Sequence, residues 1–311
     1  MTLASVPTAR SARIGLFQIS LAGVLWGTGG LVVQLIRDIT PMSVITLSVY
    51  RMLIAAAVLG VAVVAVRRGG QLRALIAQHP AHTVAVGCGT AAYQALYFGS
   101  VITAGVTVAT VIALGLAPVL LTVSDAVNER KLIALPRLVV LVTALTGLVL
   151  VSGFAGVTGP QPELGIVLAI ASGTIYAVTT ALGRPLAQRV DPLILTTATT
   201  ATGAFVLLPV GVLAGSTGPM YTADLVAVAG LVYLGVFTMA VAYGLLYAGL
   251  RTTSGSVAVV ASLLEPVTAA VLAALILGER LGPAGIAGTI LILAAVAGLG
   301  RTGAEDDPEH I

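Results

Sequence analysis

The stretch TTSGSVAVVASLLEPVTAAVLAALILGER, residues 252–280, indicates the fold class of this chain. It is apolar and exceeds the roughly 20 residues that an α-helix needs to cross a bilayer. Near its middle, however, Glu265 and Pro266 lie side by side. A carboxylate at the bilayer centre costs about 2.5–3.5 kcal/mol, and proline removes a helical hydrogen bond and crowds the carbonyl of Ser262. Two such residues together indicate a functional site inside a membrane helix.

The composition extends the membrane assignment to the whole chain. Of 311 residues, 58% are hydrophobic and 9% are charged, whereas an average soluble domain has about a quarter charged residues. The single cysteine, Cys88, excludes an intrachain disulfide and a cysteine-rich metal site. The sequence contains no HExxH, no phosphate-binding GxxxxGK[ST] and no paired intramembrane aspartates. We therefore expect an all-α membrane protein that is not an enzyme and has no cofactor, no metal and no nucleic-acid partner.

Ten apolar segments are each near the length of a membrane span. Helices satisfy their own backbone in lipid, and these runs are too long for the alternating strands of a membrane barrel. The predicted spans are residues 14–36, 42–66, 82–102, 104–127, 133–156, 164–187, 193–215, 225–249, 254–277 and 281–300. The first run is too long for a signal peptide, whose apolar core has about 7–15 residues. His79 and His82 are predicted to lie in a solvated loop, and residues 301–311 in a disordered cytoplasmic tail.

The basic residues predict the orientation. With the N-terminus inside, the outside gaps hold only Arg37 and Arg280, and Arg51 falls within a span. The inside gaps and span ends then hold Arg10, Arg13, Arg67, Arg68, Arg73, Arg130, Lys131, Arg137, Arg184, Arg189, Arg251 and Arg301. By the positive-inside rule, both termini are expected in the cytoplasm, with the chain crossing the inner or plasma membrane several times.

The two halves of the chain repeat each other. When Pro118 is aligned with Pro266, AGVTVATVIALGLAPV (104–119) matches TTSGSVAVVASLLEPV (252–267). A Glu-Arg pair and a last apolar span follow each proline. The predicted repeats cover residues 14–156 and 164–300. Since each contains five spans, the second enters the membrane in the opposite direction, which is a common plan of transporters with a midplane site between the halves.

These features together resemble a known family. Trp26-Gly27 lies in the first span, Arg51 in the second, and the ending from Pro266 to Glu279-Arg280 closes the ninth. With its ten spans and two repeats, the chain resembles the EamA family of the drug/metabolite transporter superfamily. The resemblance implies two inverted five-helix EamA repeats and the export of amino acids or other small metabolites. Some relatives move purines, nucleotide sugars or choline-like cations.

Two charged residues within spans are the first candidates for a substrate site. Glu265 shares a helical face with small residues such as Ala258, Ala261 and Ala269, which indicates that it faces the bundle interior. It is interpreted as a partner for a substrate cation or as an exchangeable proton site, with a structural hydrogen bond as the alternative. Arg51 is interpreted as an anchor for a substrate carboxylate, as a structural partner, or as a snorkelling side chain.

Further candidates are aromatic and polar residues deep within spans. The predicted substrate-binding residues, besides Glu265 and Arg51, are Trp26, Tyr93, Gln94, Tyr97, Tyr176 and Ser262. Pro118 and Pro266 are predicted hinges or site-lining kinks, each leaving a carbonyl without its helical partner. A plain packing kink is the alternative for both. The predicted cavity lies between the halves and is lined by spans 1, 3, 4, 6, 8 and 9.

The sequence therefore predicts a secondary active transporter, an exporter of a small polar metabolite such as an amino acid, working by alternating access. Without an ATP site, such transport runs on gradients. An amine or quaternary ammonium such as choline, or a drug-like cation, is the alternative cargo. Outside transport, a membrane enzyme or lipid-handling protein is the alternative. The expected partners are a small-molecule substrate and the lipid bilayer. Protons as the coupling ion, and a monomer or a homodimer, stay open.

Overall fold

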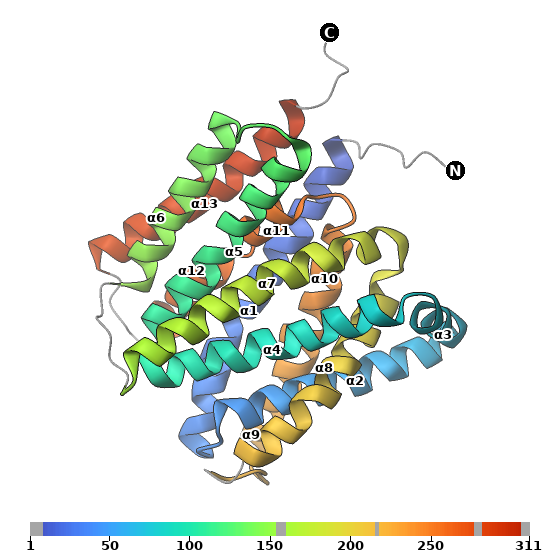
Figure 1. The fold of residues 1–311 in the computed structure, drawn as a ribbon. Coiled ribbons are helices and arrows are strands. Elements are labelled where there is room, and N and C mark those ends of the chain that lie inside the picture. Colours follow the sequence, from blue (N-terminus) through green and yellow to red (C-terminus); the bar gives the residue numbers. More distant parts are fainter. Residues whose placement is uncertain (1–8, 154–159, 215–217, 277–281, 306–311) are drawn as a thin grey trace.

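The computed structural model describes residues 9–153, 160–214, 218–276 and 282–305, which form helices joined by short connections (Figure 1). No strand occurs among those residues. The helices are α1 (Ala9–Ile39), α2 (Val44–Ala65), α3 (Gly69–Gln78), α4 (Pro80–Ala104), α5 (Val106–Glu129), α6 (Leu135–Ser152), α7 (Pro162–Arg189), α8 (Pro192–Ala214), α9 (Leu225–Gly235), the π-helix η2 (Val236–Val241), α10 (Ala242–Gly249), α11 (Gly255–Ala261), α12 (Leu264–Ile276) and α13 (Pro283–Glu305).

Every predicted span coincides with a helix or with a short succession of helices. Eight helical stretches of the described chain are long and apolar enough to cross a membrane. Of the other two predicted spans, α4 carries His82, Gln94 and two tyrosines, which lower its hydropathy, and α13 contributes only a shorter apolar helix, Pro283–Leu299. The fold is thus an all-helical membrane protein with eight such stretches, and a count of ten spans stays a prediction.

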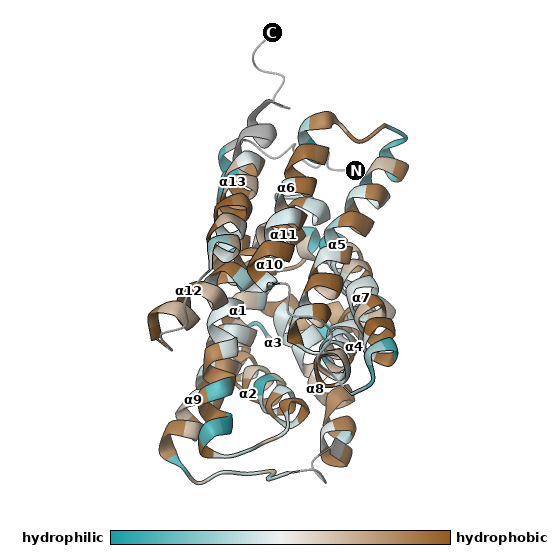
Figure 2. Cartoon of the chain, turned by 90° about the vertical axis from the view of Figure 1, so that its left-hand side faces the viewer, coloured by the Kyte–Doolittle hydropathy of each residue, from teal (hydrophilic) through white to brown (hydrophobic). Residues whose placement is uncertain are grey.

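The surface supports the membrane assignment. Large apolar side chains are exposed along many helices, including Phe17 (67% exposed), Val64 (74%) and Phe205 (80%). Hydrophobic residues make up much of the long helices (Figure 2). Soluble monomers rarely expose contiguous apolar patches beyond a few hundred Å². This protein is therefore a multi-pass integral membrane protein.

Two connections differ from the predictions. The predicted loop at His79 and His82 is largely helical, since α3 ends at Gln78 and α4 already contains His82. At the other end, α13 continues to Glu305, so the first five residues of the predicted disordered tail are helical. Residues 306–311, and the Glu279-Arg280 pair, lie outside the described residues.

The ninth predicted span is two helices rather than one kinked helix. Helix α11 ends at Ala261 and α12 begins at Leu264. The amide of Glu265 donates to the carbonyl oxygen of Ser262 at 2.9 Å. The prediction that Pro266 leaves this carbonyl unsatisfied is therefore wrong, because a tighter turn supplies the missing donor. Pro118, by contrast, lies inside the unbroken helix α5.

Helix α1 runs through the middle of the molecule and packs on α10 and α12 (Figure 1). Helix α4 packs on α7 and α8, α5 on α7, and α2 on α8. At the periphery, α6 pairs with α13 so closely that a Cβ on Gly288 would lie 2.6 Å from the carbonyl oxygen of Gly147. The helices around α1 leave a cavity between them.

Candidate functional site

A cavity of about 710 Å³ lies beside the middle and the C-terminal half of α1. Ligand pockets usually measure about 300–1,000 Å³. Helices α1, α2, α4, α7, α10 and α12 each contribute to its walls, and one residue comes from the start of α5. The lining residues are Trp26, Gly29, Gly30, Val33, Gln34, Arg37, Asp38, Pro41, Val44, Arg51, Tyr93, Gln94, Tyr97, Phe98, Val101, Val106, Tyr176, Tyr243 and Glu265.

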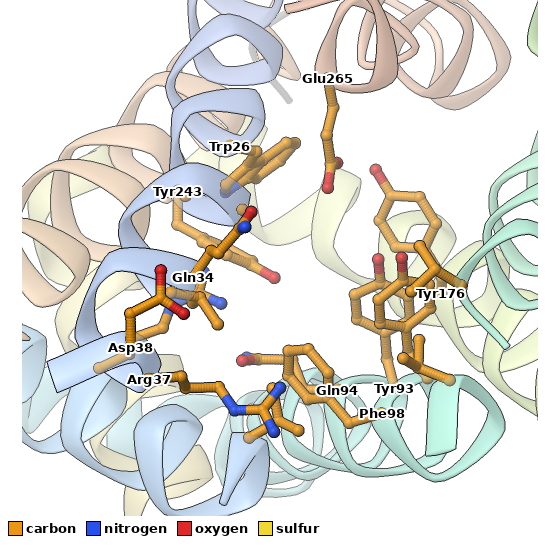
Figure 3. Close-up of a pocket in the computed structure, with 18 of the residues that line it drawn as sticks. Trp26, Gln34, Arg37, Asp38, Tyr93, Gln94, Phe98, Tyr176, Tyr243 and Glu265 are labelled. Atoms are coloured by element: carbon orange, nitrogen blue, oxygen red, sulfur yellow. The ribbon is translucent and has the colours of Figure 1, made fainter. Parts of the chain in front are cut away.

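Glu265 reaches into this cavity from the first turn of α12 (Figure 3). Gly27 lets α1 approach here, because a Cβ at that position would lie 2.5 Å from the carbonyl oxygen of Glu265. A Cβ on Gly23, one turn earlier, would lie 3.1 Å from the carbonyl oxygen of Ser262. The two glycines therefore pack within the chain. Among the described residues, no salt bridge involves Glu265. Its carboxylate lies in the first turn of α12, where the positive end of the helix dipole stabilises a negative charge.

Arg51 and Gln94 line the same cavity with buried polar atoms that lack partners. The Nε of Arg51 and both amide atoms of Gln94 are buried, and none has a hydrogen-bond partner within the described chain. The salt bridge found among the described residues joins Arg68, which lies between α2 and α3, to Asp191 and involves neither Arg51 nor Glu265. Since nearly all buried polar groups in proteins are hydrogen-bonded, these atoms indicate a site built for a polar ligand.

Aromatic rings form two groups on either side of the Glu265 carboxylate (Figure 3). Trp26 and Tyr243 meet edge to face, with ring centroids 5.3 Å apart. Tyr93 and Tyr176 stack at 4.8 Å. These four rings line the cavity around Glu265, and aromatic rings can attract a cation.

Ser262 does not line the cavity. Its hydroxyl lies 3.3 Å from the hydroxyl of Tyr176 and donates to the carbonyl oxygen of Val259 at 2.8 Å. It therefore positions Tyr176 from behind the wall. Pro118 is buried within α5, and Pro266 lies at the wall of an adjoining cavity. The other predicted site residues come together: Trp26, Arg51, Tyr93, Gln94, Tyr97, Tyr176 and Glu265.

Several lining residues were missing from the predicted site. Tyr243 was detectable, because Tyr93 and Tyr97 recur in the second half as Tyr243 and Tyr247 with the same four-residue spacing. On α1, a polar stripe continues the face of Trp26 at helical spacing. The residues of this stripe that line the cavity are Gln34, Arg37 and Asp38. Arg37, which was predicted to follow the first span, lies in the last turn of α1.

The cavity extends toward the C-terminal end of α1 and is closed on the opposite side. There the hydroxyl of Ser256 donates to the carboxylate of Asp125 at 2.6 Å, and Nε of Arg184 donates to the carbonyl oxygen of Thr253 at 2.9 Å. Beyond the tyrosines lies a void of about 20 Å³. It is lined by Thr90, Tyr93, Tyr176, Thr179, Thr180, Tyr243, Leu246, Tyr247 and Leu250. Three tyrosines thus separate the open cavity from a collapsed space.

Comparison with known proteins gives consistent results. Residues 163–301 match the EamA-like transporter family. A Bacillus subtilis (strain 168) protein described as "Uncharacterized transporter YwfM" is 29% identical over 287 residues, covering 88% of this chain and 90% of that protein. A solved crystal structure shares 21% identity and a TM-score of 0.77, covering 94% of this chain and 98% of that one. At this identity, the crystal structure shows a shared fold alone.

Proposed function

This chain belongs to the EamA-like transporter family, and from that premise we propose that it moves a small zwitterion, such as an amino acid, out of the cell. The observation that carries the proposal is the pair Arg51 and Glu265, which line one cavity with opposite charges and form no salt bridge with each other. An amino acid presents a carboxylate and an ammonium, which match these two groups.

The energetics favour a ligand that brings both charges. Removing an ion from water costs roughly several kcal/mol of free energy, unless an oppositely charged partner and hydrogen bonds replace the lost hydration. The charges of Arg51 and Glu265 attract each other across the cavity, but the two side chains form no salt bridge. A zwitterion between them supplies a partner to each, and Gln94 offers a further donor and acceptor. A ligand with one charge leaves either Arg51 or Glu265 without a compensating charge from the ligand.

Alternating access is the proposed mechanism, and helix pairing supports it. Suppose that the helices of the first half, α1, α2, α4, α5 and α6, correspond in this order to α7, α8, α9–η2–α10, α11–α12 and α13. The main helix–helix contacts are then matched by contacts between the corresponding helices. The pair α4–α7 corresponds to α10–α1, and α5–α7 to α12–α1, while α2–α8 and α6–α13 correspond to themselves. Two inverted repeats of five helices would give such a pairing, which supports the proposal.

In this mechanism the observed state is open at the end away from the chain termini. The hydrogen bond between Ser256 and Asp125 and that between Arg184 and Thr253 hold the other end closed. Breaking them, with movement of the three tyrosines, would open the collapsed void that Tyr247 lines. With both termini in the cytoplasm of a cell-membrane protein, the observed opening faces outward.

An organic cation is the second candidate cargo. The rings of Trp26, Tyr93, Tyr176 and Tyr243 surround Glu265, and such a cage binds ammonium groups through cation–π attraction and charge. In this case Arg51 would be structural and would disfavour the cargo electrostatically. The presence of Arg51 in the same cavity makes the zwitterion the better proposal.

Transport by the purified protein in liposomes tests these candidates. Radiolabelled norleucine and choline are each offered with and without a proton gradient. We expect norleucine uptake or exchange, stimulated by the gradient if Glu265 exchanges the coupling proton. Choline transport without any amino-acid transport would replace the zwitterion proposal by the cation proposal. Transport of neither, in protein that remains folded, would refute both.

A further inference from the structure

A second cavity, the side cavity, adjoins the central one at Glu265. Its volume is about 410 Å³, and it lies between α1, α5, α6 and α12. Five residues line both cavities: Trp26, Gly30, Tyr97, Val106 and Glu265. Only the side cavity is lined by Gly27, Thr107, Thr110, Leu114, Val151, Ser152, Pro266, Ala269, Ala270 and Ala273. A ligand held at Glu265 therefore has access to both spaces.

The side cavity differs chemically from the central one. Apart from Glu265 at the junction, none of its lining residues is charged. On α12, Ala269, Ala270 and Ala273 follow the glutamate and leave room where larger side chains would fill the space. The opposite walls include Leu114 and Val151. This space favours an apolar group.

Most hydroxyls of the side cavity are already engaged. Thr110 and the hydroxyl of Tyr97 are hydrogen-bonded at 2.8 Å, and Thr107 donates to the carbonyl oxygen of Ser152 at 3.2 Å. The hydroxyl oxygen of Ser152 is buried and has no partner within the described chain. Apart from Glu265 and Trp26 at the junction and this hydroxyl on the α6 wall, the lining is thus apolar or already hydrogen-bonded.

We propose that the side cavity binds a large apolar side chain of the substrate, so that the transported class is amino acids with long or bulky apolar side chains. This inference rests on the proposed function. The α-carbon of an amino acid carries an ammonium, a carboxylate and a side chain. With the ammonium at Glu265 and the carboxylate toward Arg51, the side cavity is the remaining direction for the third substituent. Burial of apolar surface there favours longer side chains.

A ligand series measures the predicted preference. Binding of free alanine, 2-aminobutyrate, norvaline and norleucine to the purified full chain is followed by calorimetry. These compounds share the same charged groups and differ by one methylene each. We expect the affinity to rise about fourfold per methylene along the series.

Variants of α12 locate the effect. Ala269→Leu and Ala273→Leu fill the side cavity near to and far from Glu265, respectively. Ala269→Leu should abolish the length dependence, and Ala273→Leu should remove it only for norleucine, with binding of free alanine preserved in both. Ala274→Leu is the matched control, because Ala274 lines neither cavity and the series should stay as in the wild type.

The outcomes separate this inference from the proposed function. Equal affinities along the series would overturn the inference and leave the zwitterion proposal standing. No binding of any of the four amino acids would overturn both. A length dependence that survives in both leucine variants would place the apolar group elsewhere and also overturn the inference. If a leucine variant fails to bind free alanine, Ala273→Val replaces it under the same criterion.

Discussion

Replacing Glu265 by glutamine removes one negative charge from the cavity wall and preserves the size of the side chain. At an effective dielectric constant of about 20, two unit charges roughly 4 Å apart attract by about 4 kcal/mol. Desolvation offsets part of this, and hydrogen bonds to charged groups contribute about 1.5–3 kcal/mol net. Since 1.4 kcal/mol corresponds to a factor of ten, norleucine should bind about 10- to 150-fold more weakly to the variant.

The same substitution should not destabilise the empty protein. The Glu265 carboxylate lines the cavity without a salt bridge to any described residue, and a neutral amide costs less to keep in that environment. We therefore expect the melting temperature of Glu265→Gln to equal or exceed that of the wild type. A site residue that weakens the free protein while it serves binding is a common compromise between stability and function.

Calorimetric binding of norleucine and thermal unfolding of the detergent-solubilised protein measure the two effects. Glu163→Gln is the matched control, because Glu163 is an exposed residue in the first turn of α7 and its replacement should change neither quantity. If Glu265→Gln binds norleucine as tightly as the wild type, the carboxylate does not hold the ammonium. A lowered melting temperature would instead show that Glu265 supports the fold.

Three further predictions follow from single contacts. Gln94→Leu removes two buried polar atoms without partners, so transport should fall while thermal stability is kept or raised, as transport assays and unfolding curves would show. Gly27→Ala places a Cβ 2.5 Å from the carbonyl oxygen of Glu265 and should destabilise the protein by about 1–3 kcal/mol; Gly30→Ala, which meets nothing within 4 Å, should not lower its melting temperature. Ser256→Ala removes a hydrogen bond to a carboxylate and should speed hydrogen exchange in α11; unchanged exchange would contradict its role in closure.

The helices were predictable because their cause is local. An apolar run in lipid must satisfy its own backbone, and a helix does so without any distant partner. Residues 14–36 and 104–127, for example, are predicted spans that coincide with α1 and α5. Glu265 could also be singled out from local sequence, since a carboxylate within an apolar span is costly whatever surrounds it. The connection at His79 was mispredicted, because α3 depends on a short polar sequence with no membrane pattern.

The membrane helices thus followed from the sequence alone, whereas the Pro-containing repeats and the charged residues of a substrate site stay predictions. The packing between helices, by contrast, places Arg51 and Glu265 on one cavity without a salt bridge, because α12 packs on α1 while α2 packs on η2, which also contacts α1. The structure also shows that the carbonyl oxygen of Ser262 accepts a hydrogen bond from the amide of Glu265 in the turn between α11 and α12. Distances between spans depend on how all the helices pack together, and no short stretch of sequence contains that information.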